Sequence, residues 1–184
     1  MKPLPRLASV ALAARCAELL APLLDALWHD APMEERNLVH TAIRDASRTA
    51  KTGRRTDTLQ TTADEITSLV GRFELHLHGL PIEMTELPES AARLDEGQIR
   101  SVRDIIDVAT RAARSANSTD GHNAFSECED GVSWSFCITD DLGDTELADE
   151  LNRTIESLYD CCGTKDITGD SKVWWTGSQW EIEN

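Results

Sequence analysis

The sequence predicts a mainly α-helical protein with a small α+β part near its C-terminus. Apolar residues recur at helical spacing through most of residues 1–116, whereas strand-like runs appear only after Asn117. With 184 residues, of which 40% are hydrophobic and 28% charged, the chain is long and apolar enough to form a core. We therefore predict an antiparallel bundle of about four helices over residues 1–117 and a hairpin–helix–hairpin unit over residues 118–184.

The first predicted helix runs from about Arg6 to Trp28 and is apolar almost all round. Its polar residues form one narrow stripe, which indicates a central helix that packs on several sides. Lys2 and Arg6 precede an apolar stretch, as in a signal peptide, but the helical pattern continues past Arg15. Because no apolar run approaches the length of a membrane span, about 18 residues, we expect no membrane segment.

The second and third predicted helices follow closely. The second runs from an N-cap at Asp30 to about Thr52, and Gly53 ends it. The third runs from Asp57 to about His78. The end of the third helix is ambiguous, because residues 73–78 alternate apolar and polar side chains as a strand would.

The fourth predicted helix begins at Asp95, with Gln98 three residues on as a capping box. Its apolar residues share one face. The opposite face carries both basic and acidic residues, among them Arg100, Asp104 and Arg111. A face of mixed charge is typical of solvent exposure, with ion pairs along the helix.

Two hairpins and a helix are predicted after residue 117. Asp130-Gly131 is a strong hairpin signal between two strand-like runs. A fifth helix is expected from Asp144 to Cys162, and the runs Lys172–Trp175 and Gln179–Ile182 are expected to form the second hairpin. The two hairpins are expected to form one antiparallel sheet under the helix.

The negative charge is concentrated in the last third of the chain. The formal net charge is −15, and residues 117–184 carry 3 Lys+Arg against 16 Asp+Glu, a balance of −13. Such a surface repels phosphate backbones, so we expect no direct nucleic-acid binding by this third. It would attract a basic partner protein or a cation, although solubility alone could also explain it.

The five cysteines are odd in number and have no regular spacing. This indicates reduced thiols and a cytoplasmic protein. Cys161-Cys162 could be a redox pair. However, the two thiols come at the C-terminal end of a predicted helix, where the helix dipole disfavours a thiolate, so packing is the preferred interpretation.

The candidate partner-binding residues fall into two groups. Three tryptophans share the terminal hairpin, and exposed Trp is enriched in binding hot spots. Three aspartates crowd the loop before the fifth helix, where weak cation binding is an alternative. The predicted site therefore consists of Trp174, Trp175, Trp180, Asp140, Asp141 and Asp144.

No catalytic motif, cofactor motif or family resemblance is present, so we expect a protein without enzymatic activity or cofactor. The leading hypothesis is an acidic inhibitor, immunity-like protein or regulatory subunit that binds an intracellular protein with a basic surface. One alternative is a metal-binding or hydrolytic domain that uses carboxylates together with His76 and His78, which would share a face of a strand. A second alternative is a scaffold subunit of a larger assembly.

Overall fold

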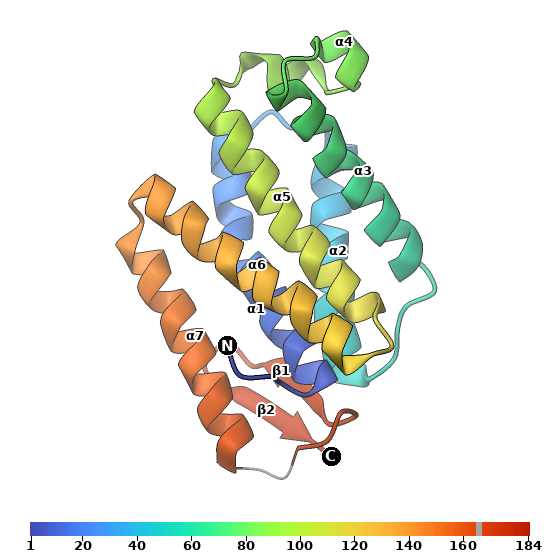
Figure 1. Cartoon of the computed structure of the whole chain (residues 1–184), viewed down its shortest axis with the longest axis vertical. Helices are drawn as coiled ribbons and strands as arrows, with labels where there is room; N and C mark the ends of the chain where they lie inside the picture. Colours follow the sequence, from blue (N-terminus) through green and yellow to red (C-terminus); the bar gives the residue numbers. More distant parts are fainter. Residues whose placement is uncertain (165–166) are drawn as a thin grey trace.

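The computed structural model describes residues 1–164 and 167–184. This part of the chain is mainly helical, with one small antiparallel sheet, which confirms the prediction of a mainly α-helical protein with a small sheet (Figure 1). The helices and strands are α1 (Arg6–Leu27), α2 (Met33–Thr52), α3 (Leu59–Leu77), α4 (Ile82–Thr85), the 3₁₀ helix η1 (Glu89–Arg93), α5 (Glu96–Asn117), α6 (Gly121–Leu142), α7 (Thr145–Thr164), β1 (Lys172–Trp175) and β2 (Trp180–Glu183).

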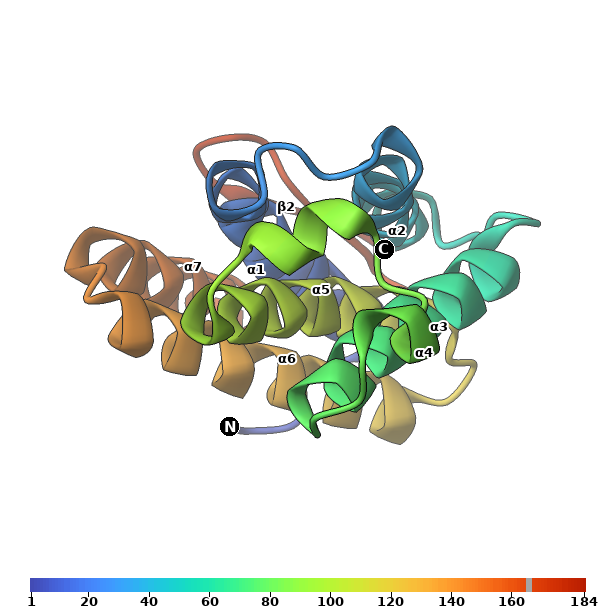
Figure 2. The ribbon, with the colours of Figure 1, turned by 90° about the horizontal axis from the view of Figure 1, so that it is seen from above.

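Two long helices, α1 and α5, organise the packing. α1 contacts α2, α5, α6, α7 and β1, while α5 contacts α1, α2, α3 and α6. Seen from above, α1 and α2 lie on one side of α5, and α6 lies on the other (Figure 2). The predicted central position of the first helix is therefore what the structure shows.

α1 is also the one helix in the described ranges that is long and apolar enough to cross a membrane by length and composition. A core helix meets the same criterion. Of its most apolar window, 72% is buried inside the molecule. Packing against the surrounding helices therefore accounts for the apolar surface of α1. Pro22, inside this helix, lies at an exposed position.

Two helix ends form as the sequence predicts. Gly53 ends α2 in the left-handed conformation, with φ of 70°, which only glycine adopts without strain. At the start of α5, Gln98 donates its backbone N–H to Asp95 Oδ1 at 2.8 Å, and Asp95 donates its own N–H to Gln98 Oε1 at 3.0 Å. The predicted cap at Asp30 is wrong, because its carboxylate accepts a bond from Arg93 instead.

The predicted hairpin around Asp130-Gly131 is wrong, because residues 121–142 form the helix α6. A Cβ on Gly131 would lie 3.3 Å from Arg111 Cβ, so this glycine allows α6 to approach α5 closely. Cys128 and Ser135 on α6 are both fully buried. Burial on α1 and α5 thus overrides a turn signal that is strong only locally.

The sheet contains a single hairpin, so the predicted sheet of two hairpins is also wrong. β1 and β2 pair antiparallel, with Trp175 opposite Trp180 and Trp174 opposite Glu181. The helix before this hairpin, α7, begins where it was expected, because Leu147 donates its N–H to Asp144 Oδ1 at 3.0 Å. The ambiguous residues 73–77 belong to the helix α3.

Candidate functional site

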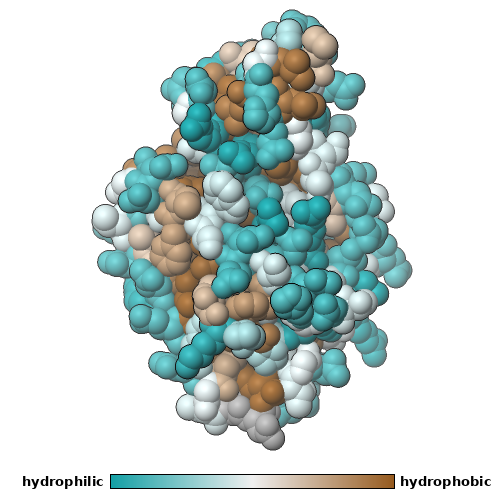
Figure 3. Space-filling model, in the orientation of Figure 1, coloured by the Kyte–Doolittle hydropathy of each residue, from teal (hydrophilic) through white to brown (hydrophobic). Residues whose placement is uncertain are grey.

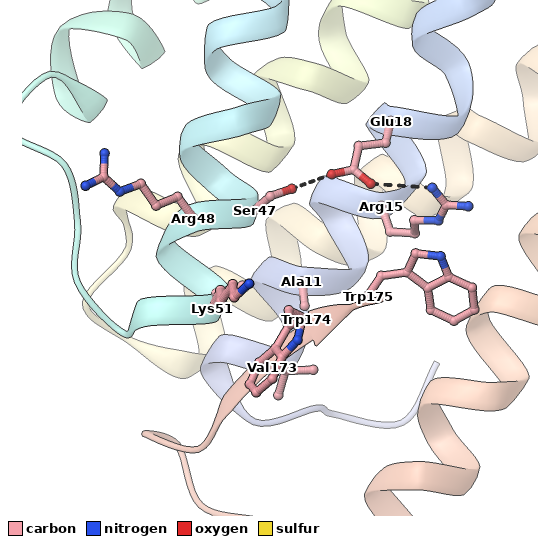
Figure 4. A pocket seen from close by; sticks show the side chains of 10 residues that line it. Ala11, Arg15, Glu18, Ser47, Arg48, Lys51, Val173, Trp174 and Trp175 are labelled. Atoms are coloured by element: carbon pink, nitrogen blue, oxygen red, sulfur yellow. Dashed lines mark hydrogen bonds and ion pairs between the residues drawn. The ribbon is translucent and has the colours of Figure 1, made fainter. Parts of the chain in front are cut away.

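A pocket of about 230 Å³ lies between α1, α2 and β1 (Figure 4). α1 contributes three residues at helical spacing, α2 contributes four near its end, and β1 contributes three consecutive residues. The lining is Ala11, Arg15, Glu18, Ser47, Arg48, Ala50, Lys51, Val173, Trp174 and Trp175. The hairpin is therefore what closes this pocket over the two helices.

Strand pairing decides which tryptophan meets which surface. Trp175 and Trp180 are directly opposite in the register and therefore lie on the same face of the hairpin. Their rings touch edge to face, with centroids 5.2 Å apart. Trp180 is 5% exposed and donates its indole N–H to Thr154 O at 3.0 Å. Its ring is therefore buried in the protein, and its one hydrogen-bond donor already has an internal acceptor.

Trp174 lies on the opposite face of the hairpin and is half-buried. The Lys51 ammonium sits over its ring, 5.7 Å from the centroid. Figure 4 shows Lys51 extending from α2 above Trp174, and Arg48 extending from the same helix to the other side. Of the three predicted tryptophans, Trp174 is thus the one beside exposed cations.

An ion-pair network fixes the far wall of the pocket. Arg15 pairs with Glu18 at 3.4 Å and with Glu150 of α7 at 3.7 Å, and its guanidinium lies 5.3 Å from the Trp175 ring centroid. Glu18 also accepts a bond of 2.5 Å from the Ser47 hydroxyl, which ties α1 to α2 (Figure 4). The charges of Arg15 and Glu18 on this wall are therefore paired within the protein.

A second, open pocket of about 820 Å³ adjoins the first and shares Arg48 and Lys51 with it. It lies where α2 ends and β1 begins. Five of its eight lining residues are cations, and one is an acid; the lining is Arg48, Lys51, Thr52, Arg54, Arg55, Thr56, Asp57 and Lys172. We call this set the basic pocket.

The three predicted aspartates lie at the turn between α6 and α7. Asp140 and Asp144 line a hollow of about 440 Å³, together with the apolar atoms of Phe136 and Ala148. Asp140 and Asp141 are exposed, whereas the Asp144 carboxylate is partly used to cap α7. We call this region the acidic corner.

The structure does not bring the two predicted groups together. Trp180 contacts α7 at Thr154, which lies about 15 Å along the helix from Asp144 at 1.5 Å per residue. The hairpin and the acidic corner lie towards opposite ends of α7 (Figure 1). The surroundings of Trp174 are basic rather than acidic.

His76 and His78 lie at the C-terminal end of α3, two positions apart on a helix, so their imidazoles point in different directions. His76 Nδ1 is 3.2 Å from Leu80 O. Within residues 1–164 and 167–184, no group of three or more His, Cys, Asp and Glu side chains is placed to hold a metal ion. The geometry that motivated the metal hypothesis requires a strand here, and that strand does not form.

The cysteines behave as packing residues where they are buried. Burial raises the pKa of the Cys16 thiol to about 12 and holds the pKa of Cys128 well above its usual value. At the end of α7, burial and then the neighbouring Cys161 raise the pKa of Cys162 to about 11. A thiolate is therefore disfavoured at all three sites.

Exposed apolar side chains gather at the end of the molecule that carries α4 (Figure 3). Met84 is 67% exposed, Leu75 47% and Leu80 36%. Met84 lies in the four-residue helix α4, whereas Leu75 lies near the C-terminal end of α3.

Sequence reasoning missed the basic pocket. The available signal was the run Lys51–Arg55, in which three of five residues are basic within an otherwise acidic chain. The run is easily overlooked, because cations such as Lys51 near the C-terminus of a helix are expected to complement the helix dipole. A comparison with known protein families, curated proteins and solved structures finds no match to this chain.

Proposed function

We propose that this protein is a non-enzymatic binding module, an inhibitor or regulatory subunit, that binds a basic partner protein through α7 and the acidic corner. The observation that carries the proposal is a stripe of exposed carboxylates on the outer face of α7. Its members are Glu146, Asp149, Glu156 and Asp160. None of these four lies within ion-pair distance of a described Lys or Arg.

Electrostatic repulsion between carboxylates of this stripe destabilises helix α7 in the isolated protein. Glu156 and Asp160 are four positions apart on one helix, where like charges repel and destabilise the helix by about 0.2–0.5 kcal/mol per pair. Arg153 is the one cation on this stretch of α7, and it pairs with Glu150 at 2.9 Å. A partner that brings lysines or arginines would remove this repulsion, and its approach would be accelerated by the negative field.

The hollow at the acidic corner offers an anchor beside the charges. Its apolar floor, with Phe136 and Ala148, suits the aliphatic stem of a partner's Lys or Arg. The head group of such a side chain would reach Asp140 at the rim. An apolar centre with a charged rim is the usual arrangement of a protein interface.

The proposal is tested by capture from a native lysate with two charge-matched variants. The test variant, D149N/E156Q with D140N, neutralises the proposed surface. The control variant neutralises three exposed acids on α2, α4 and η1 that make no ion pair with any described residue, namely Glu34, Glu83 and Glu89. Both variants have the same net charge, so a difference between them reports the location of the charge.

We expect the wild type and the control to retain a basic protein at mild salt and release it at high salt, because screening weakens exposed charge pairs. The test variant should retain much less of it and associate more slowly in a kinetic binding assay. Equal retention by the two variants would show that bulk charge, rather than this face, is responsible, and would refute the proposal.

A further inference from the structure

We propose that the basic pocket, together with the smaller pocket beside Trp174, is a binding site for a small organic phosphate of the nucleotide type. The phosphate groups would bind among the cations at the end of α2, and the ring would bind in the slot between α1, α2 and β1. This site is separate from the acidic corner and does not depend on the function proposed above.

The first argument is the state of the cations. Arg48 and Arg54 are exposed, and neither makes an ion pair with any carboxylate in the described residues. Lys51 has a ring contact with Trp174 and no acidic partner in the same range. With 33 Asp+Glu against 18 Lys+Arg, this chain has acids in excess, yet three neighbouring cations around one pocket are left without them.

The second argument is that the border of the pocket is held in place. Arg55 donates from Nη1 to Asn117 O at 2.8 Å, which anchors the loop after α2 to the end of α5. Lys172 pairs with Glu183 across the hairpin at 3.2 Å. These two contacts hold the loop after α2 and the strand β1 in place on either side of the unpaired cations.

The third argument is the slot itself. Its volume of about 230 Å³ exceeds that of an engineered protein cavity of about 150 Å³ that binds benzene. Ala11, Ala50, Val173 and Trp174 give it apolar walls. The Ser47 hydroxyl at its upper edge donates to Glu18, and its oxygen is left as an acceptor for an N–H group of a heterocycle (Figure 4). The slot thus suits a planar ring better than a bare ion.

Phosphate is the anion that this set of donors fits best. Guanidinium groups bind phosphate oxygens with two parallel hydrogen bonds, and an ammonium such as Lys51 adds a point charge. Thr52 and Thr56, which also line the basic pocket, supply hydroxyl groups. Two guanidiniums and an ammonium match the charge of a diphosphate.

Calorimetric titration of the full chain with three probes tests the proposal. Pyrophosphate supplies only the charged part of the ligand, adenosine only the ring, and ADP both. We expect ADP to bind more tightly than either part, with a rise in Kd as salt is added. If no probe binds at millimolar concentration, or if pyrophosphate binds as tightly as ADP, the two-part site is refuted.

Two variants separate the contributions. R48Q/R54Q should weaken ADP by about tenfold to a hundredfold for each guanidinium removed, whereas R153Q, which removes an exposed charge on α7, should leave the Kd unchanged. W174A should reduce the preference for ADP over pyrophosphate and leave pyrophosphate binding intact. An unchanged Kd for ADP in R48Q/R54Q, with circular dichroism showing an intact fold, would overturn the assignment.

Discussion

Replacing Trp180 with alanine tests whether the terminal hairpin is an integral part of the fold. The side chain is 5% exposed, its ring touches Trp175 at 5.2 Å, and its indole N–H binds Thr154 O at 3.0 Å. The substitution removes all three interactions at once. It also empties the space between the hairpin and α7, so the pocket beside Trp174 would lose its support.

The expected loss of stability follows from the area involved. A buried Trp removes about 150–250 Å² from water, which at about 25 cal/mol per Å² is worth about 4–6 kcal/mol. Measured Trp-to-Ala changes in protein cores cost about 3–5 kcal/mol, and we expect W180A to fall in that range. W180F keeps most of the apolar body and loses the hydrogen bond, so it should cost about 1–2 kcal/mol.

Urea unfolding followed by far-ultraviolet circular dichroism gives the free energy of the helices, to which the hairpin contributes little signal. The matched control is W174A, because Trp174 lies on the opposite face of the same hairpin and is half-buried. W174A should cost about 1 kcal/mol, mainly through its contact with Lys51. If W180A costs no more than W174A, the hairpin is not coupled to the helices and the reasoning fails.

Three further predictions concern buried polar groups and thiols. Burial raises the pKa of Asp104 from 3.8 to about 6, so ionisation of this carboxyl destabilises the folded protein above pH 6 and has no effect below about pH 4. As pH rises through that window, the free energy of unfolding of D104N should exceed that of the wild type by up to about 3 kcal/mol. Urea unfolding at several pH values measures this difference. T154V should raise the melting temperature, because Thr154 Oγ1 is buried without a hydrogen-bond partner among the described atoms and its removal stabilises the folded state by about 1 kcal/mol. A melting temperature equal to or lower than that of the wild type would contradict this prediction. In the native protein Cys137, which is exposed, should react with a thiol reagent before Cys16, and C137S should abolish the fast phase.

Most of the helical architecture could be predicted, because the apolar residues of α1, α2, α3 and α5 recur at helical spacing, although the Asp30 cap was wrong and the end of α3 was ambiguous. Gly53, and Asp95 with Gln98, act at the positions where the sequence places them. α6 could not be predicted in the same way. Asp130-Gly131 carries a hairpin signal, but the buried set that includes Phe125, Cys128 and Val132 follows a helical period that small and polar members obscure.

The candidate sites were harder to predict, because each depends on which residues meet in space. The sequence identified Trp174 and Asp140 as surface candidates, but it could not show that they lie on separate surfaces. It could not show the basic pocket either, since Lys172 joins Arg48 and Arg54 only when β1 docks on the end of α2. Spacing along one helix is visible in a sequence, whereas convergence of a helix end, a loop and a strand is not.

The distribution of ion pairs links the two proposals. Several charges are paired between α5 and α6; Arg111, for example, binds Glu127 and Asp130, each at 3.0 Å. Among the described residues, four exposed acids without an ion pair share one face of α7, and three cations without an acidic partner share the pocket at the end of α2. We propose that these two surfaces bind ligands of opposite charge, because each would attract and steer a ligand of the other sign. Because the surfaces share no residue, substitutions on one should leave binding at the other unchanged.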